Sequence, residues 1–273
     1  LNRIQAEGEL RVEAAALSWR CLLELKEMRE AHRSLAWVLE QNPDHVDAHR
    51  GMAAIAYDMG NLTAALHHLD QWSRLDDADG RSYRLKALIY YFLRQDIKAE
   101  RAYRDALKRD LSPAFRQAVQ LELAETLIRM TQHAEALTTL EERLAARDEK
   151  EDLASMALRA ECYWQLGKLT EAANLIDRAM KEYPEDAQIL SLRGQICLAR
   201  KETDQAVKLL ERAVALTPGE YLCRYRLAQA YAAANRGEDA LRERKRAEDL
   251  LKVIEQIGQF SDEAMKKPWD AKV

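Results

Sequence analysis

The sequence predicts an all-α protein built from antiparallel pairs of helices. The 273 residues include only nine Gly and five Pro, whereas a chain rich in strands and hairpin turns would need more of both. Apolar residues also recur with a fixed period along most of the chain, and a period of this length is typical of helix–turn–helix repeats. Charged residues make up 32% of the chain with a net charge of −4, which argues against general binding to a polyanion.

A series of leading alanines sets the period, and their spacings are 34, 34, 37, 36, 34 and 34 residues. These alanines are Ala31, Ala65, Ala99, Ala136, Ala172, Ala206 and Ala240. Twelve residues before each of them stand Trp19, Ala53, Ala87, Ala124, Ala160, Gly194 and Ala228. Nine residues before stand Leu22, Ala56, Tyr90, Leu127, Tyr163, Cys197 and Tyr231. Small residues allow the two helices of a hairpin to approach closely, while the larger ones fill the space between successive hairpins.

The end of each first helix is predicted five residues before its leading alanine. Gly60 and Gly167 occupy this position, and glycine readily adopts the left-handed conformation that ends a helix. Asn235 can adopt it at modest cost, whereas Arg94, Thr131 and Lys201 are poorer choices.

These residues resemble the tetratricopeptide repeat family, which has a small and an aromatic residue on one helix, then A-x-x-x-F-x-x-A and a proline. The best copy is Leu153–Asp186, in which Ala160, Tyr163, Gly167, Ala172, Ala179 and Pro184 are all in register. The resemblance implies a right-handed superhelical solenoid of antiparallel helix hairpins in one continuous array. The expected repeats are residues 12–45, 46–79, 80–116, 117–152, 153–186, 187–220 and 221–251.

The first, fourth and last copies depart from the pattern. Trp19 stands where a small residue is expected, and Arg143 stands at the second alanine. Arg244 occupies the bulky site and predicts a more polar last hairpin. Residues 252–273 are expected to cap the array through an apolar stripe of Leu250, Ile254 and Ile257. Because "KKPWDAKV" resembles the start of another copy, we expect a further repeat to follow.

No enzymatic motif is present, and we expect neither catalysis nor a cofactor. His45 and His49 are spaced i, i+4, but a metal site needs more ligands, so we interpret them as part of a solvated helix start. The cysteines are interpreted as small buried hydrophobic residues, and they are Cys21, Cys162, Cys197 and Cys223. The side chains of the basic run 242–246 point in all directions around a helix, and neighbouring acidic residues reduce the local positive charge. We therefore expect no nucleic-acid partner.

The family resemblance implies a concave groove lined by the first helices, in which the family binds peptide segments. The candidate groove residues are Arg50, Tyr57, Arg84, Tyr91, Leu121, Ile128, Trp164, Leu198 and Tyr225. Aromatic residues and Arg dominate binding hot spots, although Tyr57, Tyr91 and Trp164 packing internally is an equally open alternative. Tyr163 is assigned to the core and Trp164 to partner contact.

The groove composition narrows the expected ligand. None of the five asparagines falls on an inner position, so the carboxylate clamp and the asparagine ladder of some family members are missing. We therefore expect the ligand to be a segment that is apolar, or that binds to aromatic rings, lying along repeats two to five.

Three functions remain open at this point. The first is a non-catalytic scaffold for a protein partner, the second is self-association, and the third is the targeting region of a larger enzyme. No run approaches the ~18 apolar residues of a membrane span. An intracellular compartment is favoured. The compartment is nevertheless left open, because a signal or anchor could lie upstream of this sequence.

Overall fold

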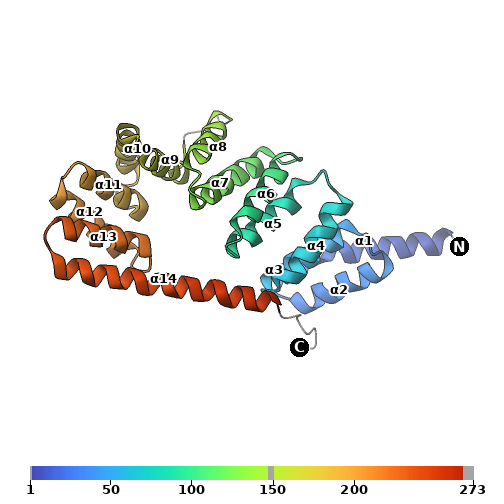
Figure 1. The fold of residues 1–273 in the computed structure, drawn as a ribbon. Helices are drawn as coiled ribbons and strands as arrows, with labels where there is room; N and C mark the ends of the chain where they lie inside the picture. The colour runs from blue at the N-terminus through green and yellow to red at the C-terminus, as the bar shows by residue number, and fades with distance from the viewer. Residues whose placement is uncertain (1, 147–150, 267–273) are drawn as a thin grey trace. The chain divides into compact units, whose positions relative to one another are not determined.

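A computed structural model describes residues 2–146 and 151–266 of the chain. Within these residues it contains fourteen helices, one isolated β-bridge and no strand, which confirms the all-α helical-repeat fold (Figure 1). The first helices of the pairs are α1 (Asn2–Glu24), α3 (Val46–Asp58), α5 (Gly80–Phe92), α7 (Pro113–Arg129), α9 (Leu153–Gln165), α11 (Ala187–Ala199) and α13 (Tyr221–Ala233). The second helices are α2 (Met28–Gln41), α4 (Leu62–Leu75), α6 (Asp96–Leu107), α8 (His133–Ala145), α10 (Leu169–Glu182), α12 (Thr203–Leu216) and α14 (Gly237–Lys266).

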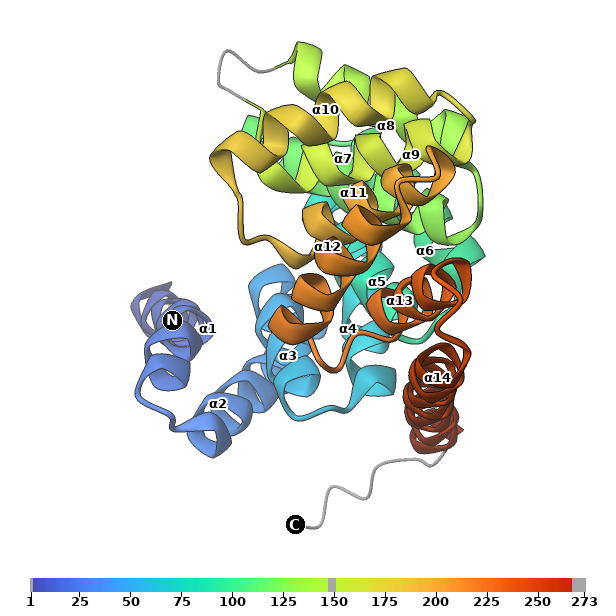
Figure 2. The ribbon, with the colours of Figure 1, turned by 90° about the vertical axis from the view of Figure 1, so that its left-hand side faces the viewer.

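The chain divides into two compact units, and each is described by itself. Unit 1 comprises Leu1–Val119 with Ser261–Val273, and unit 2 comprises Gln120–Phe260. In unit 1 the pairs α1–α2, α3–α4 and α5–α6 follow one another, as do α9–α10 and α11–α12 in unit 2 (Figures 1 and 2). The expected single array stays a prediction.

The small residues predicted at the helix crossings lie in the core. Ala87, Ala124 and Ala160 are buried, as the spacing requires. At Gly194 on α11, an added Cβ would lie 2.5 Å from Leu210 Cγ on α12. Any side chain at this position would require Leu210 to move. The two helices of the hairpin can therefore approach this closely only because residue 194 is a glycine.

Trp19, the departure in the first copy, is accommodated by a glycine on the next first helix. Trp19 is buried in the core cluster formed by α1, α2 and α3. A Cβ on Gly51 would lie 3.0 Å from Trp19 Cδ2 and 2.6 Å from Leu35 Cδ1. The large and the small residue have therefore been exchanged between adjacent helices, which preserves the packing volume.

The predicted left-handed helix ends are confirmed in every pair. The φ angles are 73° at Gly60, 74° at Gly167 and 59° at Asn235. The less suitable residues adopt the same conformation, with φ of 58° at Arg94, 60° at Thr131 and 64° at Lys201. Lys26, which the sequence reading did not single out, has a φ of 62°. Tertiary packing of the hairpins therefore overrides the local preference of these residues.

The other two departures are satisfied by polar partners. Arg143 is buried and donates a hydrogen bond to Ser155 Oγ, while its Nη2 lies 2.8 Å from Asp152 Oδ2. Arg244 is exposed and pairs with Glu248 at 3.1 Å along α14, as expected for a polar last hairpin.

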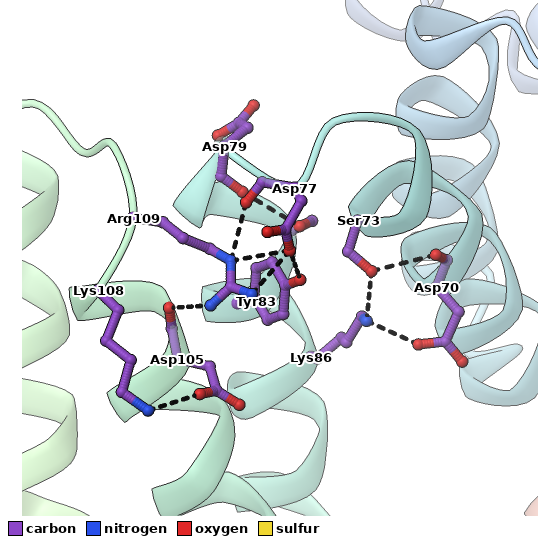
Figure 3. A network of polar contacts seen from close by, with 10 residues as sticks. Asp70, Ser73, Asp77, Asp79, Tyr83, Lys86, Asp105, Lys108 and Arg109 are labelled. Atoms are coloured by element: carbon purple, nitrogen blue, oxygen red, sulfur yellow. Dashed lines mark hydrogen bonds and ion pairs between the residues drawn. The ribbon is translucent and has the colours of Figure 1, made fainter.

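A network of polar contacts ties the α4–α5 loop to the end of α6 in unit 1 (Figure 3). Asp77 stands twelve residues after its leading alanine, where other copies have Pro43, Pro184 and Pro218. Arg109 Nη2 lies 2.7 Å from Asp77 Oδ1, and the Arg109 guanidinium lies 3.7 Å from the Tyr83 ring centroid. Tyr83 also donates to Asp77, and these hydrogen bonds lower the pKa of the Asp77 carboxyl. We infer that this network orders a loop that lacks its proline.

The C-terminal helix differs from the expected cap. Residues 252–266 continue α14, the second helix of the last pair, instead of forming a separate capping helix. Ile254 is 40% exposed and Ile257 is 60% exposed, so the predicted stripe does not cover the last hairpin. Residues 267–273, which also belong to the predicted cap, lie outside the described part of the chain.

Thr131→Gly should stabilise the protein, because a β-branched residue at a φ of 60° is strained and glycine is not. We expect a gain of roughly 0.5–1 kcal/mol in the free energy of unfolding, measured by urea denaturation with circular dichroism. Gly60→Ala is the matched control and should destabilise by a similar amount. A loss of stability in Thr131→Gly would contradict the strain argument.

Candidate protein-binding surface

In unit 1 the same pair of predicted residues recurs on two successive first helices. Arg50 and Tyr57 lie on α3, and Arg84 and Tyr91 lie 34 residues later on α5. Residues seven apart are separated by about two helical turns, so each Arg and Tyr share one side of their helix. Tyr57 is 41% exposed, and the other three residues are half-buried.

Arg50 belongs to an arrangement of arginines around Trp72. The guanidinium carbon of Arg50 lies 5.6 Å from the centroid of the Trp72 ring, and that of Arg81 lies 5.7 Å away. Arg81 is paired at 2.6 Å with buried Asp79, whereas Asp47 lies 3.4 Å from Arg50. Stacking on an indole ring restricts a guanidinium without neutralising it.

Arg50 also experiences positive charge from its surroundings. Burial lowers its pKa most, and the nearby charges of Arg81 and Arg20 lower it further, against the opposite effects of Asp47 and Asp79. Arginines and carboxylates therefore both lie close to Arg50 on this side of unit 1.

Aromatic rings lie beside the second pair. Arg84 lies over the Phe115 ring at 5.4 Å, and Tyr91 meets Phe92 edge-on with ring centroids 6.1 Å apart. Phe92 is exposed. Arginine and aromatic side chains thus alternate on the first helices of unit 1, which is a composition typical of binding hot spots.

Most of the candidate groove residues in unit 2 are half-buried. Leu121 and Ile128 on α7 are half-buried, and Leu198 packs partly buried against the core of α11 to α13. Trp164 is half-buried and packs against the same core cluster as Tyr163, and its role in partner contact stays a prediction. Tyr225, at 46% exposure, is the most accessible of the five.

A buried network in unit 2 was missed by the sequence reading. Arg226 on α13 is 3% exposed and donates from Nη1 to Ser191 Oγ and from Nη2 to Glu161 Oε2, both at 3.0 Å. These contacts join three first helices, α13, α11 and α9. Ser191 is fully buried at this contact. The charge of Arg226 at a position occupied by Leu192 in the preceding copy was the available signal.

The interpretation of His45 and His49 as a solvated helix start is wrong, since they are 8% and 6% exposed. His45 Nδ1 accepts a hydrogen bond from the Ala48 amide and begins α3. His49 Nε2 lies 2.9 Å from the Pro43 carbonyl, and its Nδ1 lies 2.9 Å from His68 Nδ1. A carbonyl can only accept, so neutral His49 carries its proton on Nε2 and His68 donates to His49.

In the described part of the chain, neither metal-binding side chains nor cysteines add a candidate site. Within the described residues, no three His, Cys, Asp or Glu side chains are placed to hold a metal ion. Cys162, Cys197 and Cys223 are buried as expected, and burial raises the pKa of Cys162 to about 12. Cys21 is exposed, so its assignment to the core is wrong.

Three pockets among the described residues are lined by side chains other than the predicted groove residues. One of about 530 Å³ lies between the α4–α5 and α6–α7 loops and includes Arg81 and Phe115. One of about 520 Å³ lies against α1 and α2 and includes Trp37 and His45. A smaller one of about 350 Å³ lies beside α14 and includes Leu250.

Two surface properties bear on the partner. Along α14 the arginines of the basic run pair with carboxylates of the same helix, as Arg242 does with Asp239 at 3.2 Å and Arg246 with Glu243 at 2.5 Å. Across residues 2–146 and 151–266, no helix combines the length and apolar character needed to cross a bilayer.

Comparison with known proteins agrees with this fold. The model of the family ChAPs (Chs5p-Arf1p-binding proteins) matches residues 92–244, and a tetratricopeptide repeat model matches residues 13–89. A comparison with curated proteins gives no match.

Solved structures share the architecture at low sequence identity. A tetratricopeptide repeat protein from Parabacteroides merdae has a TM-score of 0.71 at 15% identity, over 93% of this chain and 99% of that one. PilF from Pseudomonas aeruginosa has a TM-score of 0.63 at 18% identity, over 81% and 98%. YrrB, a tetratricopeptide repeat protein, has a TM-score of 0.57 at 18% identity, over 69% and 95%.

The hairpins and these matches define a tetratricopeptide repeat protein, and such a fold indicates a protein-interaction scaffold. The ChAPs model matches more than half of the length of this chain, so the chain belongs to the ChAPs family.

Acid should destabilise the His49–His68 pair. Burial, followed by the neighbouring imidazoles of His49, His67 and His32, lowers the pKa of His68 to about 4, against 6.5 for an unperturbed histidine. Between pH 6.5 and about 4 the unfolded state therefore binds more protons, so stability is present above pH 6.5 and falls as the pH is lowered. After allowance for solvent screening we expect a loss of about 1–2 kcal/mol from His68.

His68→Gln separates this effect from the titration of carboxylates. The glutamine amide can still donate to His49 Nδ1 but does not titrate. Urea denaturation from pH 7 to pH 4 should show a shallower loss of stability in His68→Gln than in the unsubstituted chain. Equal slopes would contradict the assignment.

Proposed function

We propose that this chain is a non-catalytic scaffold that binds a segment of a partner protein on its first helices. The observation that carries the proposal is the repetition of an Arg and a Tyr on α3 and α5, namely Arg50 with Tyr57 and Arg84 with Tyr91. A pair repeated once per hairpin suits a ligand that runs across successive hairpins and meets the same chemistry at each.

The charge around Trp72 refines the expected ligand. Burial lowers the pKa of Arg50 most, and the positive charges of Arg81 and Arg20 lower it further, so an acidic group would be favoured beside Arg50. Tyr57, Tyr91 and Phe92 offer apolar surface along the same helices. We therefore propose a partner segment that alternates acidic with apolar or aromatic side chains.

Relatives support protein binding as the activity. Members of the ChAPs family are described as binding Chs5p and Arf1p, and YrrB is described as having an unusual peptide-binding site. Function lies in a site and not in a fold, so the identity of the partner must come from these particular side chains.

Peptide selection tests this proposal directly. A display library of random 15-residue peptides is selected against the full chain, and enriched peptides should combine acidic with apolar residues. Arg50→Gln with Tyr57→Ala should weaken their binding at least about tenfold, because both are hot-spot residue types. Fluorescence anisotropy of labelled peptides measures the dissociation constants.

The matched control replaces residues of the same types elsewhere. Arg74→Gln with Tyr183→Ala removes an exposed arginine and a tyrosine of similar exposure, and it should leave binding unchanged. Circular dichroism confirms that both double variants remain folded. Peptides without acidic residues, or equal binding by both double variants, would refute the proposed surface.

Self-association is a second candidate, favoured by an exposed apolar stripe on α14. Leu251, Val253, Ile254 and Ile257 are all exposed, and a second copy of α14 could cover them. Sedimentation equilibrium should then detect a dimer that Val253→Lys with Ile257→Lys dissociates at least about tenfold more readily. A monomeric unsubstituted chain at high concentration would exclude this candidate.

A further inference from the structure

The pocket of about 520 Å³ in unit 1 is lined by three consecutive elements. It lies against the first half of α1, the last turn of α2 and the residue that begins α3. Its lining residues are Gly8, Arg11, Val12, Glu13, Trp37, Gln41, Asn42 and His45. None of them belongs to the Arg–Tyr surface of α3 and α5, so the pocket is a separate feature.

His45 supplies an unused hydrogen-bond donor at this pocket. Its side chain is 8% exposed, and its Nδ1 accepts from the Ala48 amide at 3.3 Å. Because that nitrogen accepts, the neutral ring carries its proton on Nε2. Nε2 is buried and has no hydrogen-bond partner among the described residues. A buried donor without an acceptor is costly, and a ligand oxygen would relieve that cost.

The remaining walls favour an anionic oxygen joined to a flat or apolar group. The Arg11 guanidinium lies 5.6 Å from the centroid of the Trp37 ring and supplies positive charge. Asn42 Oδ1 accepts from the Asp44 amide, which leaves the Asn42 side-chain NH₂ as a donor. Trp37 adds apolar surface where the equivalent residues of other copies, such as Gln71, Asp105 and Arg212, are polar.

The chain's own Glu13 shows which chemistry is attracted to His45. Glu13 Oε1 lies 3.4 Å from His45 Nε2, which is longer than a normal N–H···O hydrogen bond. The Glu13 side chain is 63% exposed, so it can turn into water at little cost and leave the position beside Nε2 to another carboxylate.

We propose that this pocket binds a carboxylate, with His45 Nε2–H and Arg11 as its donors and Trp37 as the surface for the adjacent apolar group. The carboxylate could come from the C-terminus of a peptide or from an acidic side chain, since both present the same oxygens. Glu13 then competes with the ligand and sets its affinity.

Three short probes separate the possible sources. Acetyl-Ala-Phe carries a free C-terminal carboxylate, acetyl-Ala-Phe amide carries none, and acetyl-Glu-Phe amide carries only a side-chain carboxylate. Each is titrated into the ¹⁵N-labelled full chain while the Trp37 indole N–H resonance is followed, assigned by its loss in Trp37→Phe. We expect at least one of the two carboxylate probes to give saturable shifts. Its affinity should be at least about tenfold higher than that of the uncharged probe.

Two variants connect binding to the named side chains. His45→Asn retains an oxygen that can begin α3 but lacks the Nε2 donor, so affinity should fall about tenfold without loss of helix. Glu13→Gln removes the competing charge and should raise affinity severalfold. His133→Asn, at the start of α8 in unit 2, is the matched control and should change nothing.

The proposal is overturned if the uncharged probe binds as well as both carboxylates, or if none of the three binds. It is also overturned if His45→Asn binds like the unsubstituted chain. Because the Arg–Tyr surface shares no residue with the pocket, Arg50→Gln with Tyr57→Ala should leave carboxylate binding intact. The two proposals can therefore fail separately.

Discussion

The close approach of the two helices in each hairpin is the constraint on which the structure depends. A residue with little or no side chain must stand at the crossing, as Ala160 does on α9 and Gly194 on α11. Where the first hairpin instead places Trp19 on α1, Gly51 on α3 supplies the missing space. Packing density is conserved although the residues that provide it are exchanged. This approach also fixes the turn between the helices, which is why Thr131 accepts a left-handed conformation that its own preference opposes.

Charged residues replace repeat-defining residues at several places, and each replacement has a partner. Asp77 stands at a proline position and is bound by Arg109 and Tyr83 (Figure 3). Arg143 stands at an alanine position and is bound by Asp152. Arg143 is buried, and a buried charge without its partner would be strongly destabilising, so Arg143 and Asp152 must be retained or lost together. They make individual hairpins distinct from the general repeat and give the chain its own pattern of contacts.

The proposed binding surfaces arise where the repeat leaves residues unconstrained. Arg50 and Tyr57 on α3 and Trp37 on α2 are not among the residues that define the repeat. The first surface offers arginines beside aromatic rings to an extended acidic and apolar segment. The pocket at His45 offers a single buried donor to one carboxylate. Both are proposed to bind negatively charged groups, and they share no residue.

The all-α fold, the left-handed helix ends and the buried crossing residues are predictable from the amino-acid sequence alone, because they follow from a period that every copy repeats. It also marked Trp19, Arg143 and Arg244 as departures, although not what would compensate for them. The packing of Trp164 against the core, the hydrogen bond from Arg226 to Ser191 and the burial of His45 and His49 are visible only in the three-dimensional structure. Periodicity identifies the face of a helix, but burial depends on the neighbouring helix, and that helix is specified elsewhere in the chain.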